Sequence, residues 1–228
     1  MTDIDGGDLH ALILAGGLSR RLGGVAKAGL MLEEQTLLAR TVDAAACVIA
    51  AHRTTASGAG QGDGGIAVVG PVEKIAGWLA TAKHCGQAVA VQENPPYCGP
   101  AAGIAAGTGA LAGESGHVLV LACDMPHAGE VARFLVAKLA DCSPGEGVMA
   151  VAAGKQQPLA AIYPLAELRA AADAARASHR LENASVFSLI ARLNMLEVAV
   201  PAQLTADIDT WADARSQGIA AGPPAAEG

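Results

Sequence analysis

Short apolar runs alternate with longer segments rich in Ala and Leu along most of the chain. We expect the apolar runs to form strands at residues 9–14, 66–69, 87–91, 117–122, 147–152, 158–163 and 195–200. The longer segments have helical length, and we expect helices at residues 37–46, 73–85, 101–111, 129–140, 165–177, 184–193 and from residue 211. Strands that read as near-continuous apolar runs and alternate with helices are typical of a parallel sheet covered on both faces. The pattern therefore predicts one α/β domain of three layers, α/β/α, with a mostly parallel, Rossmann-like sheet.

No repeat and no shift in composition divides the chain into two domains. We expect a flexible N-terminus at residues 1–8, a single folded domain at 9–217 and a disordered tail at 218–228. Residues 56–65 consist entirely of Gly, Ala, Ser, Gln and Asp, which predicts a loop extension within the domain.

Composition excludes several classes of protein. The 228 residues carry a formal net charge of -7 without a dense Lys/Arg cluster, which argues against a nucleic-acid binder that neutralises phosphates. The five cysteines are scattered without a C-x-x-C pair, so we expect neither a disulfide framework nor a zinc site. The acidic N-terminus and the short apolar runs favour a cytoplasmic protein without a membrane span. We therefore expect a small-molecule partner.

The most informative segment follows the first predicted strand. In open α/β sheets, ligands bind beyond the carboxyl ends of the strands, and residues 12–27 read LILAGGLSRRLGGVAK. The glycines allow the backbone to approach a phosphate chain and present N–H groups to it. Ser19 adds a hydroxyl, and Arg20, Arg21 and Lys27 add positive charge with no carboxylate nearby in the segment. The pattern predicts an anion-binding loop with unpaired cations, although it matches neither the Walker A nor the G-x-G-x-x-G motif.

A carboxylate ends the most apolar predicted strand. Asp124 follows the run HVLVLA-C, where an isolated charge is costly unless it meets a cation. A divalent metal that carries substrate phosphates is one partner for such a group. The alternative is that Asp124 only caps the next helix.

Taken together, these segments resemble the molybdenum cofactor guanylyltransferase family. The shared motifs are L-A-G-G-x-S-x-R-h-G-x-x-x-K after the first strand and C-D-x-P at residues 123–126. Further similarity lies in CGPAAG at 98–103, QQPLAAIY at 156–163 and DIDTWAD at 207–213. The similarity extends from about residue 9 to residue 213, nearly the whole chain.

The resemblance implies an Mg²⁺-dependent nucleotidyltransferase with the nucleotide-diphospho-sugar transferase type of fold. Such an enzyme transfers GMP from GTP to the terminal phosphate of molybdopterin, the organic part of the molybdenum cofactor, and releases pyrophosphate. The resemblance implies that Lys27, Arg21 and Asp124 are catalytic and that Asp124 and Asp209 hold Mg²⁺. It implies nucleotide contacts from Leu14, Ala15, Gly16, Gly17, Ser19, Arg20, Lys27, Gly99 and Gly103, the last two approaching the base or ribose. It also implies transient contact with molybdoenzymes or other proteins of cofactor biosynthesis.

Some positions depart from the family pattern. Ala26 stands where the family usually has an aspartate before its lysine, Ala101 replaces a leucine, and Trp211 replaces a proline. The D-I-D-T form is shared with cytidylyl-transferring relatives. Those relatives usually have L-A-A-G in the first loop and C-D-Q-P at the strand end, so Gly16-Gly17 and Met125 in this chain favour guanine. Three alternatives stay open: a cytidylyl-transferring or other relative that uses a nucleoside triphosphate (NTP), a nucleotide-binding module without activity, and a nicotinamide-dependent oxidoreductase. The absent G-x-G-x-x-G motif disfavours the last of these.

Overall fold

The computed structural model describes residues 8–17, 19–55 and 65–219. The predicted flexible N-terminus (except residue 8), most of the predicted loop extension and residues 220–228 of the predicted tail lie outside this range. The side chain of Arg20 is also outside the description.

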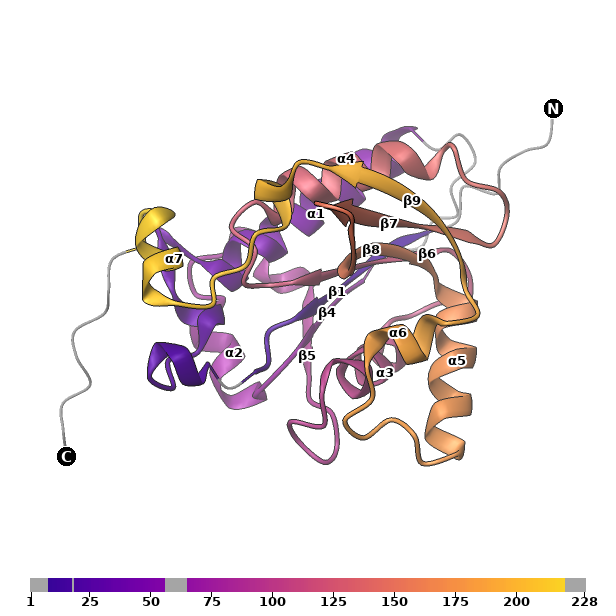
Figure 1. Ribbon diagram of the computed structural model, residues 1–228, viewed down its shortest axis with the longest axis horizontal. Helices are drawn as coiled ribbons and strands as arrows, with labels where there is room; N and C mark the ends of the chain where they lie inside the picture. Colours follow the sequence, from indigo (N-terminus) through magenta and orange to yellow (C-terminus); the bar gives the residue numbers. More distant parts are fainter. Residues whose placement is uncertain (1–7, 18, 56–64, 220–228) are drawn as a thin grey trace.

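A seven-stranded sheet runs through the centre of the domain (Figure 1). Its order is β5-β4-β1-β6-β8-β7-β9. The strands are β1 (Leu9–Leu14), β4 (Ile66–Val69), β5 (Ala88–Val91), β6 (His117–Ala122), β7 (Glu146–Ala152), β8 (Lys155–Pro164) and β9 (Asn194–Val200). Pairing is parallel from β5 to β6 and between β7 and β9, whereas β8 is antiparallel to both of its neighbours. The expected mostly parallel sheet is confirmed.

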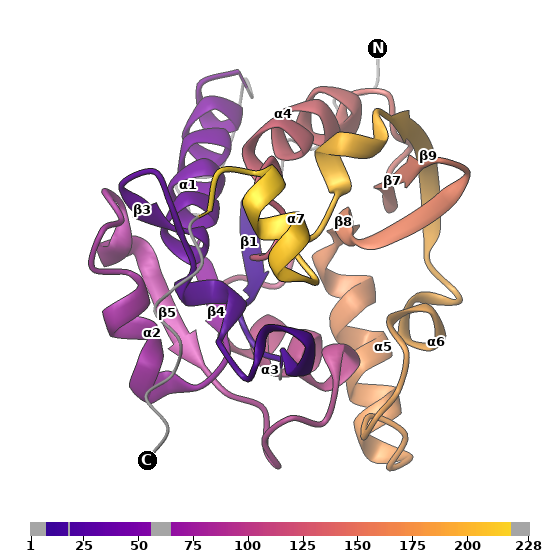
Figure 2. The same cartoon turned by 60° about the vertical axis from the view of Figure 1, so that its left-hand side comes forward.

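Helices cover both faces of the sheet, as the three-layer prediction requires. Helices α1 (Leu37–Thr55) and α4 (Ala128–Leu139) lie on one face, and α3 (Pro100–Ala110), α5 (Leu165–Ala177) and α6 (Val186–Ile190) lie on the other (Figure 2). Successive residues of β1 serve the two faces: Ile13 packs in the core under α1 and α4, and Leu12 packs in the core against α3 and α5. None of the helices in the described ranges is long and apolar enough to cross a membrane.

Several helix ends differ from the sequence expectation. Helix α1 continues to Thr55 instead of residue 46, because Val48 and Ile49 extend its buried face. Helix α2 (Val72–Trp78) ends seven residues before the expected position, and a 3₁₀ helix, η3 (Cys85–Gln87), precedes β5. Helix α6 is shorter than expected because the Ser185 side chain accepts a hydrogen bond from the Ser188 N–H and sets its start.

The C-terminal part of the domain forms a small third core. Helix α7 (Trp211–Ser216) packs with Ile208, Leu22 and Leu30, and Ile219 joins the same cluster with 1% of its surface exposed. The prediction of a tail starting at residue 218 is therefore wrong for residues 218 and 219, because Ile219 is a buried core residue. The sequence analysis also missed a short hairpin of β2 (Met31–Leu32) and β3 (Gln35–Thr36).

Candidate functional site

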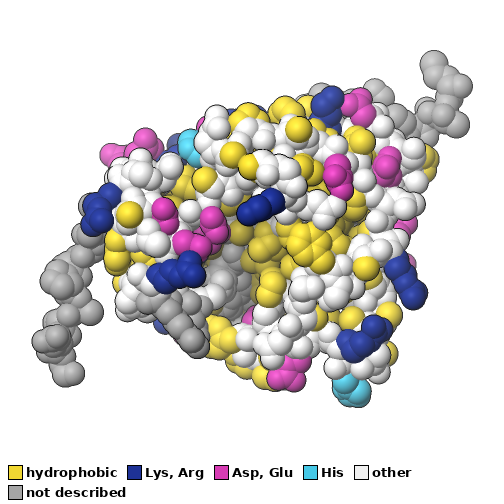
Figure 3. Space-filling model, in the orientation of Figure 1, with side chains coloured by type: hydrophobic (Ala, Val, Ile, Leu, Met, Phe, Trp, Pro, Cys, Tyr) yellow, Lys and Arg dark blue, Asp and Glu magenta, His cyan; other side chains and the backbone are white. Residues whose placement is uncertain are grey.

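A cavity of about 720 Å³ opens at the carboxyl ends of β1, β4 and β6. Figure 3 shows the surface hollowed there, with hydrophobic side chains in the hollow and charged side chains beside it. Every predicted site residue whose side chain is described lines this cavity: Leu14, Ala15, Gly16, Gly17, Ser19, Arg21, Lys27, Gly99, Gly103, Asp124 and Asp209. The lining also includes residues that the sequence analysis did not single out, among them Glu93, Tyr97, Gln157, Leu159 and Asp207.

Backbone hydrogen bonds hold the start of the glycine-rich loop at the sheet. The Ala15 N–H donates to the Val69 carbonyl at 2.8 Å, and the Leu14 carbonyl accepts from the Cys123 N–H at 3.1 Å. Gly17 has a φ of 132°, a conformation that L side chains rarely adopt. A Cβ at Gly16, by contrast, would meet only the Gly70 Cα at 3.9 Å, which is an ordinary contact. Gly17 is therefore required by the turn, whereas Gly16 leaves space next to the cavity.

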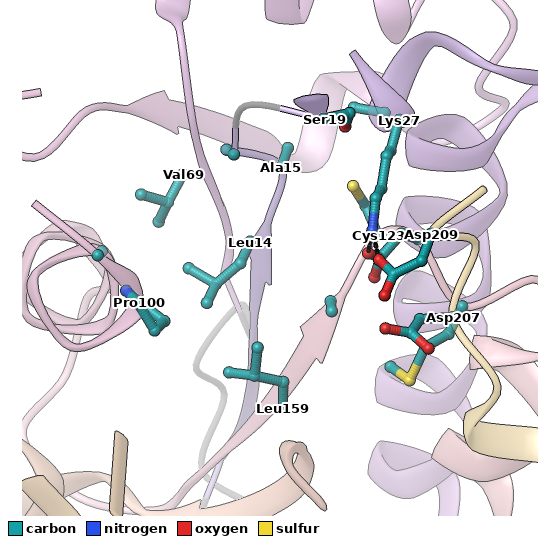
Figure 4. Close-up of a pocket in the computed structure, with 18 of the residues that line it drawn as sticks. Leu14, Ala15, Ser19, Lys27, Val69, Pro100, Cys123, Leu159, Asp207 and Asp209 are labelled. Atoms are coloured by element: carbon teal, nitrogen blue, oxygen red, sulfur yellow. Dashed lines mark hydrogen bonds and ion pairs between the residues drawn. The ribbon is translucent and has the colours of Figure 1, made fainter. Parts of the chain in front are cut away.

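Lys27 is not the unpaired cation that the sequence suggested. Its Nζ donates to Asp124 Oδ2 at 2.8 Å and to Asp209 Oδ1 at 2.6 Å, and its side chain is only 20% exposed (Figure 4). Burial alone lowers the pKa of Lys27, but the hydrogen bonds and charges of the two aspartates outweigh burial and raise it. The expectation failed because both carboxylates come from elements far from the loop in sequence.

The two aspartate segments are joined directly to each other. The Ile208 N–H donates to the Asp124 carbonyl at 3.1 Å, and the Ile208 side chain is fully buried. A capping box at the start of α7 fixes the following turn, because Thr210 accepts from the Asp213 N–H and Asp213 accepts from the Thr210 N–H. These contacts hold Asp209 beside the end of β6.

Three carboxylates meet at this point. Asp124, Asp207 and Asp209 each offer an oxygen, and these oxygens lie within 4.8 Å of one another. Partial burial, followed by the negative charges of Asp209 and Asp124, raises the pKa of Asp207. An all-oxygen set of this kind fits a hard divalent cation such as Mg²⁺. Asp207 was missed as a site residue, although the alternation in D-I-D around a buried isoleucine was the signal for it.

Asp124 does not cap the next helix. The N-cap position of α4 is His127, which makes no side-chain capping bond, and Asp124 directs its carboxylate to Lys27 instead. The structure thus contradicts the helix-cap alternative. Arg21 is more loosely placed, since its side chain is 75% exposed and its Nη1 lies 3.6 Å from Asp209 Oδ2.

The opposite end of the cavity is apolar. Figure 4 shows Leu14, Val69, Pro100 and Leu159 on the side away from Lys27 and the aspartates. A Cβ at Gly103 would lie 3.1 Å from the Leu14 side chain, so the packing of α3 on β1 restricts this position.

Gly99 is also restricted by the fold. Its φ is 90°, and a Cβ there would lie 3.6 Å from the Asn183 Cα. The sequence analysis expected both Gly99 and Gly103 to be needed for close approach of a ligand. Local backbone geometry and packing already account for glycine at both positions.

A bulge in β8 supplies part of the apolar wall. The β7–β8 pairing jumps from Met149↔Ala161 to Ala150↔Gln157, which leaves three residues of β8 without partners in β7. The fully buried Tyr163 donates its hydroxyl to the Pro158 carbonyl at 2.8 Å. Five residues of extended strand would span about 16 Å, more than a tyrosine side chain alone can reach, and this bond lies across the irregular part of β8.

We expect Tyr163→Phe to lower the free energy of unfolding by about 1 kcal/mol, since the hydrogen bond from the buried Tyr163 ring to the partly buried Pro158 carbonyl is lost. Chemical denaturation measures the change. Thr41→Val is a suitable control, because the Thr41 hydroxyl is also buried but donates to a helical carbonyl, that of Leu37. Equal losses in the two variants would contradict a special role of the Tyr163 bond.

The fold and the cavity together define a class of α/β protein with a glycine-rich loop and an acidic cluster at the carboxyl ends of its central strands. The chain belongs to the MobA-like NTP transferase domain family, whose sequence pattern matches residues 11–194. The molybdenum cofactor guanylyltransferase of Acidiphilium cryptum is 34% identical over 169 residues, which cover 73% of this chain and 72% of that protein. A probable molybdenum cofactor guanylyltransferase of Opitutus terrae is 31% identical over 204 residues, which cover 89% of this chain and 90% of that protein.

Solved structures share the fold. The molybdopterin-guanine dinucleotide biosynthesis protein A of Archaeoglobus fulgidus has a TM-score of 0.56 at 20% identity, over 91% of this chain and 96% of that chain. The 4-diphosphocytidyl-2C-methyl-D-erythritol synthase of Anaerococcus prevotii has a TM-score of 0.66 at 16% identity, over 93% and 97%. Because both identities are low, these structures support the fold and not a choice between nucleotides.

Proposed function

We propose that this protein transfers GMP from GTP to the terminal phosphate of molybdopterin and releases pyrophosphate. The observation that carries the proposal is the convergence of the glycine-rich loop, Lys27 and the three aspartates in one cavity. Membership of the MobA-like family and the two relatives named guanylyltransferase support the same substrate pair.

The reaction joins two anionic groups, so it depends on charge neutralisation and alignment. Lys27 and Arg21 would neutralise phosphate charge, and the backbone from Gly16 to Ser19 would bind the β- and γ-phosphates. Arg20 remains a proposed nucleotide contact from the sequence alone. The apolar end of the cavity would hold a ring system of one of the two substrates. No general base is needed, since the attacking phosphate is already ionised.

Mg²⁺ fits the acidic cluster, because carboxylate oxygens are its preferred protein ligands. Asp124 and Asp209 would hold the ion, which supplies positive charge against the α-phosphate when it is bound. We further propose transient contacts with other proteins of cofactor biosynthesis or with molybdoenzymes, which would receive the product.

Pyrophosphate release tests the proposal. The assay uses each of the four nucleoside triphosphates, with and without molybdopterin, at a fixed Mg²⁺ concentration. We expect release with GTP that depends on molybdopterin. A preference for CTP would identify a cytidylyl-transferring enzyme. Binding of GTP without release would identify an inactive module, for which Ala26 in place of the family's aspartate would be the first explanation.

Gly16→Ala probes the choice of base. A methyl group at this position would not clash with the protein, because its nearest neighbour is the Gly70 Cα at 3.9 Å. Any effect should therefore come from the ligand, and we expect reduced use of GTP and weaker discrimination against CTP. The measurement is kcat/KM for both nucleotides. Gly77→Ala is a matched control, because a Cβ at Gly77 also meets open space but lies away from the cavity.

A further inference from the structure

The inference concerns how a divalent cation and a nucleotide enter the cavity, and it rests on the proposed function. We propose that Lys27 is a built-in counter-ion of the acidic cluster. The triphosphate draws its ammonium group away from Asp124 and Asp209, and the cation then binds those two carboxylates. We further assign Asp207 as the carboxylate that meets the cation first.

The first observation is that Lys27 and the cation would use the same two carboxylates. The Lys27 Nζ lies 2.8 Å from Asp124 Oδ2 and 2.6 Å from Asp209 Oδ1. These are charge-assisted hydrogen-bond distances. Mg²⁺ binds oxygen at about 2.0–2.1 Å and demands near-octahedral geometry. A metal ion bound to these carboxylates would lie close to the Lys27 ammonium, and the two positive charges would repel each other, so we expect the ion pairs to open when the metal binds.

The second observation is that the backbone at Lys27 is anchored while the side chain is long. Lys27 begins the 3₁₀ helix η2 (Lys27–Gly29), whose next residue, Ala28, is buried, and the Lys27 carbonyl accepts from the Leu30 N–H at 3.0 Å. A lysine stem of four methylene groups can turn from the aspartates to a phosphate without movement of this backbone. The glycine-rich loop that would bind the phosphate lines the same cavity.

The third observation is the balance of charge. Three carboxylates share the cluster with one mostly buried ammonium, and Arg21 adds only an exposed contact at 3.6 Å. A triphosphate that approaches alone meets a negative cluster, and a divalent cation that approaches alone must displace an ammonium. Each ligand removes the obstacle for the other, so their binding is cooperative.

Asp207 differs from the other two aspartates. Lys27 donates to Asp124 and Asp209, whereas Asp207 lies outside these two hydrogen bonds and is the most exposed of the three aspartates. Its carboxylate is nevertheless within 4.8 Å of both others. An incoming cation can therefore bind Asp207 before the ion pairs open.

Binding of Mn²⁺ to the nucleotide-free protein tests the proposal without any catalytic step. The free ion is measured by electron paramagnetic resonance for wild type, Lys27→Met, Asp207→Asn and the control Lys138→Met. Lys138 on α4 forms an ion pair of similar length, 2.9 Å, with Asp141, but this pair is exposed and lies away from the cavity. Lys27→Met keeps most of the apolar stem, and Lys27→Gln is a second variant if the first does not fold.

We expect removal of the competing ammonium to tighten Mn²⁺ binding by about tenfold in Lys27→Met. Asp207→Asn should weaken it by about fivefold or more, and Lys138→Met should leave it unchanged. A non-hydrolysable GTP analogue should tighten Mn²⁺ binding to wild type and reduce the difference from Lys27→Met. Equal or weaker binding by the Lys27 variants without nucleotide would overturn the counter-ion role. Unchanged binding by Asp207→Asn would overturn the role of Asp207.

These results are independent of the transfer reaction. Cooperative binding of Mn²⁺ and the analogue by a protein that transfers no GMP would refute the proposed function and retain this inference. Active GMP transfer, together with Mn²⁺ binding that changes neither in Lys27→Met nor with the nucleotide analogue, would retain the proposed function and refute this inference.

Discussion

Asp124→Asn is expected to lower metal-dependent turnover by about a thousandfold, which corresponds to about 4 kcal/mol of lost transition-state stabilisation. Asp124 stands at the carboxyl end of the central strand β6 and takes part in both the acidic cluster and the Lys27 ion pair. Asparagine keeps the shape of the side chain but removes its charge. A magnesium titration of pyrophosphate release measures the loss.

Asp209→Asn is the comparison for this experiment. The resemblance to the guanylyltransferase family implies that asparagine is tolerated at this position, so we expect partial activity with a raised Mg²⁺ requirement. The Asp209 side chain is also more open, at 45% exposure against 20% for Asp124. An inactive Asp209→Asn together with an active Asp124→Asn would show that the two roles are reversed.

The stability of Asp124→Asn without metal is a separate test, because the sequence and the structure lead to different expectations for it. From sequence alone, the loss of an uncompensated buried carboxylate should leave the protein without metal no less stable. The ion pair with Lys27 compensates that charge, so we now expect a loss of about 1 kcal/mol. Denaturation in a chelator decides between the two expectations.

The fold was predictable because its signals are local and repeated. The runs at β1, β4 and β6 are apolar on both faces, and their bounds match the expectation. Helix ends were less predictable, because they depend on tertiary contacts. Helix α1 extends to Thr55 because Val48 and Ile49 also pack in the core against the sheet. The sequence pattern does not show this contact. The β8 bulge is likewise invisible in a run that reads as one strand.

The candidate site was predictable by residue type but not by pairing. The strand-end rule correctly placed the glycine-rich loop and Asp124 at one cavity. It could not show that Lys27 contacts Asp124 and Asp209, because these contacts span 97 and 182 positions of sequence. The D-I-D alternation pointed to Asp207, but its position beside Asp124 depends on the Ile208 hydrogen bond that brings its loop to β6.

Lys27→Ala is expected to lower turnover at saturating GTP by about a hundred- to a thousandfold, the usual effect of removing one charged donor at a reacting group. The same change removes the only ammonium in contact with Asp124 and Asp209 among the described residues. Like charges then face one another, so the protein without metal should also lose stability. Added Mg²⁺ should raise the melting temperature of Lys27→Ala more than that of wild type, because the metal supplies the missing positive charge.

Two further variants serve as comparisons for Lys27→Ala. Lys27→Arg keeps the charge but changes its shape, so it should be more stable than Lys27→Ala while still impaired in turnover. Lys138→Ala removes a lysine from an exposed ion pair on α4 and should change neither property. Turnover of Lys27→Ala within about threefold of wild type would show that this side chain does not act at the reacting phosphates. Its ion pairs would then serve only to hold Asp124 and Asp209 together.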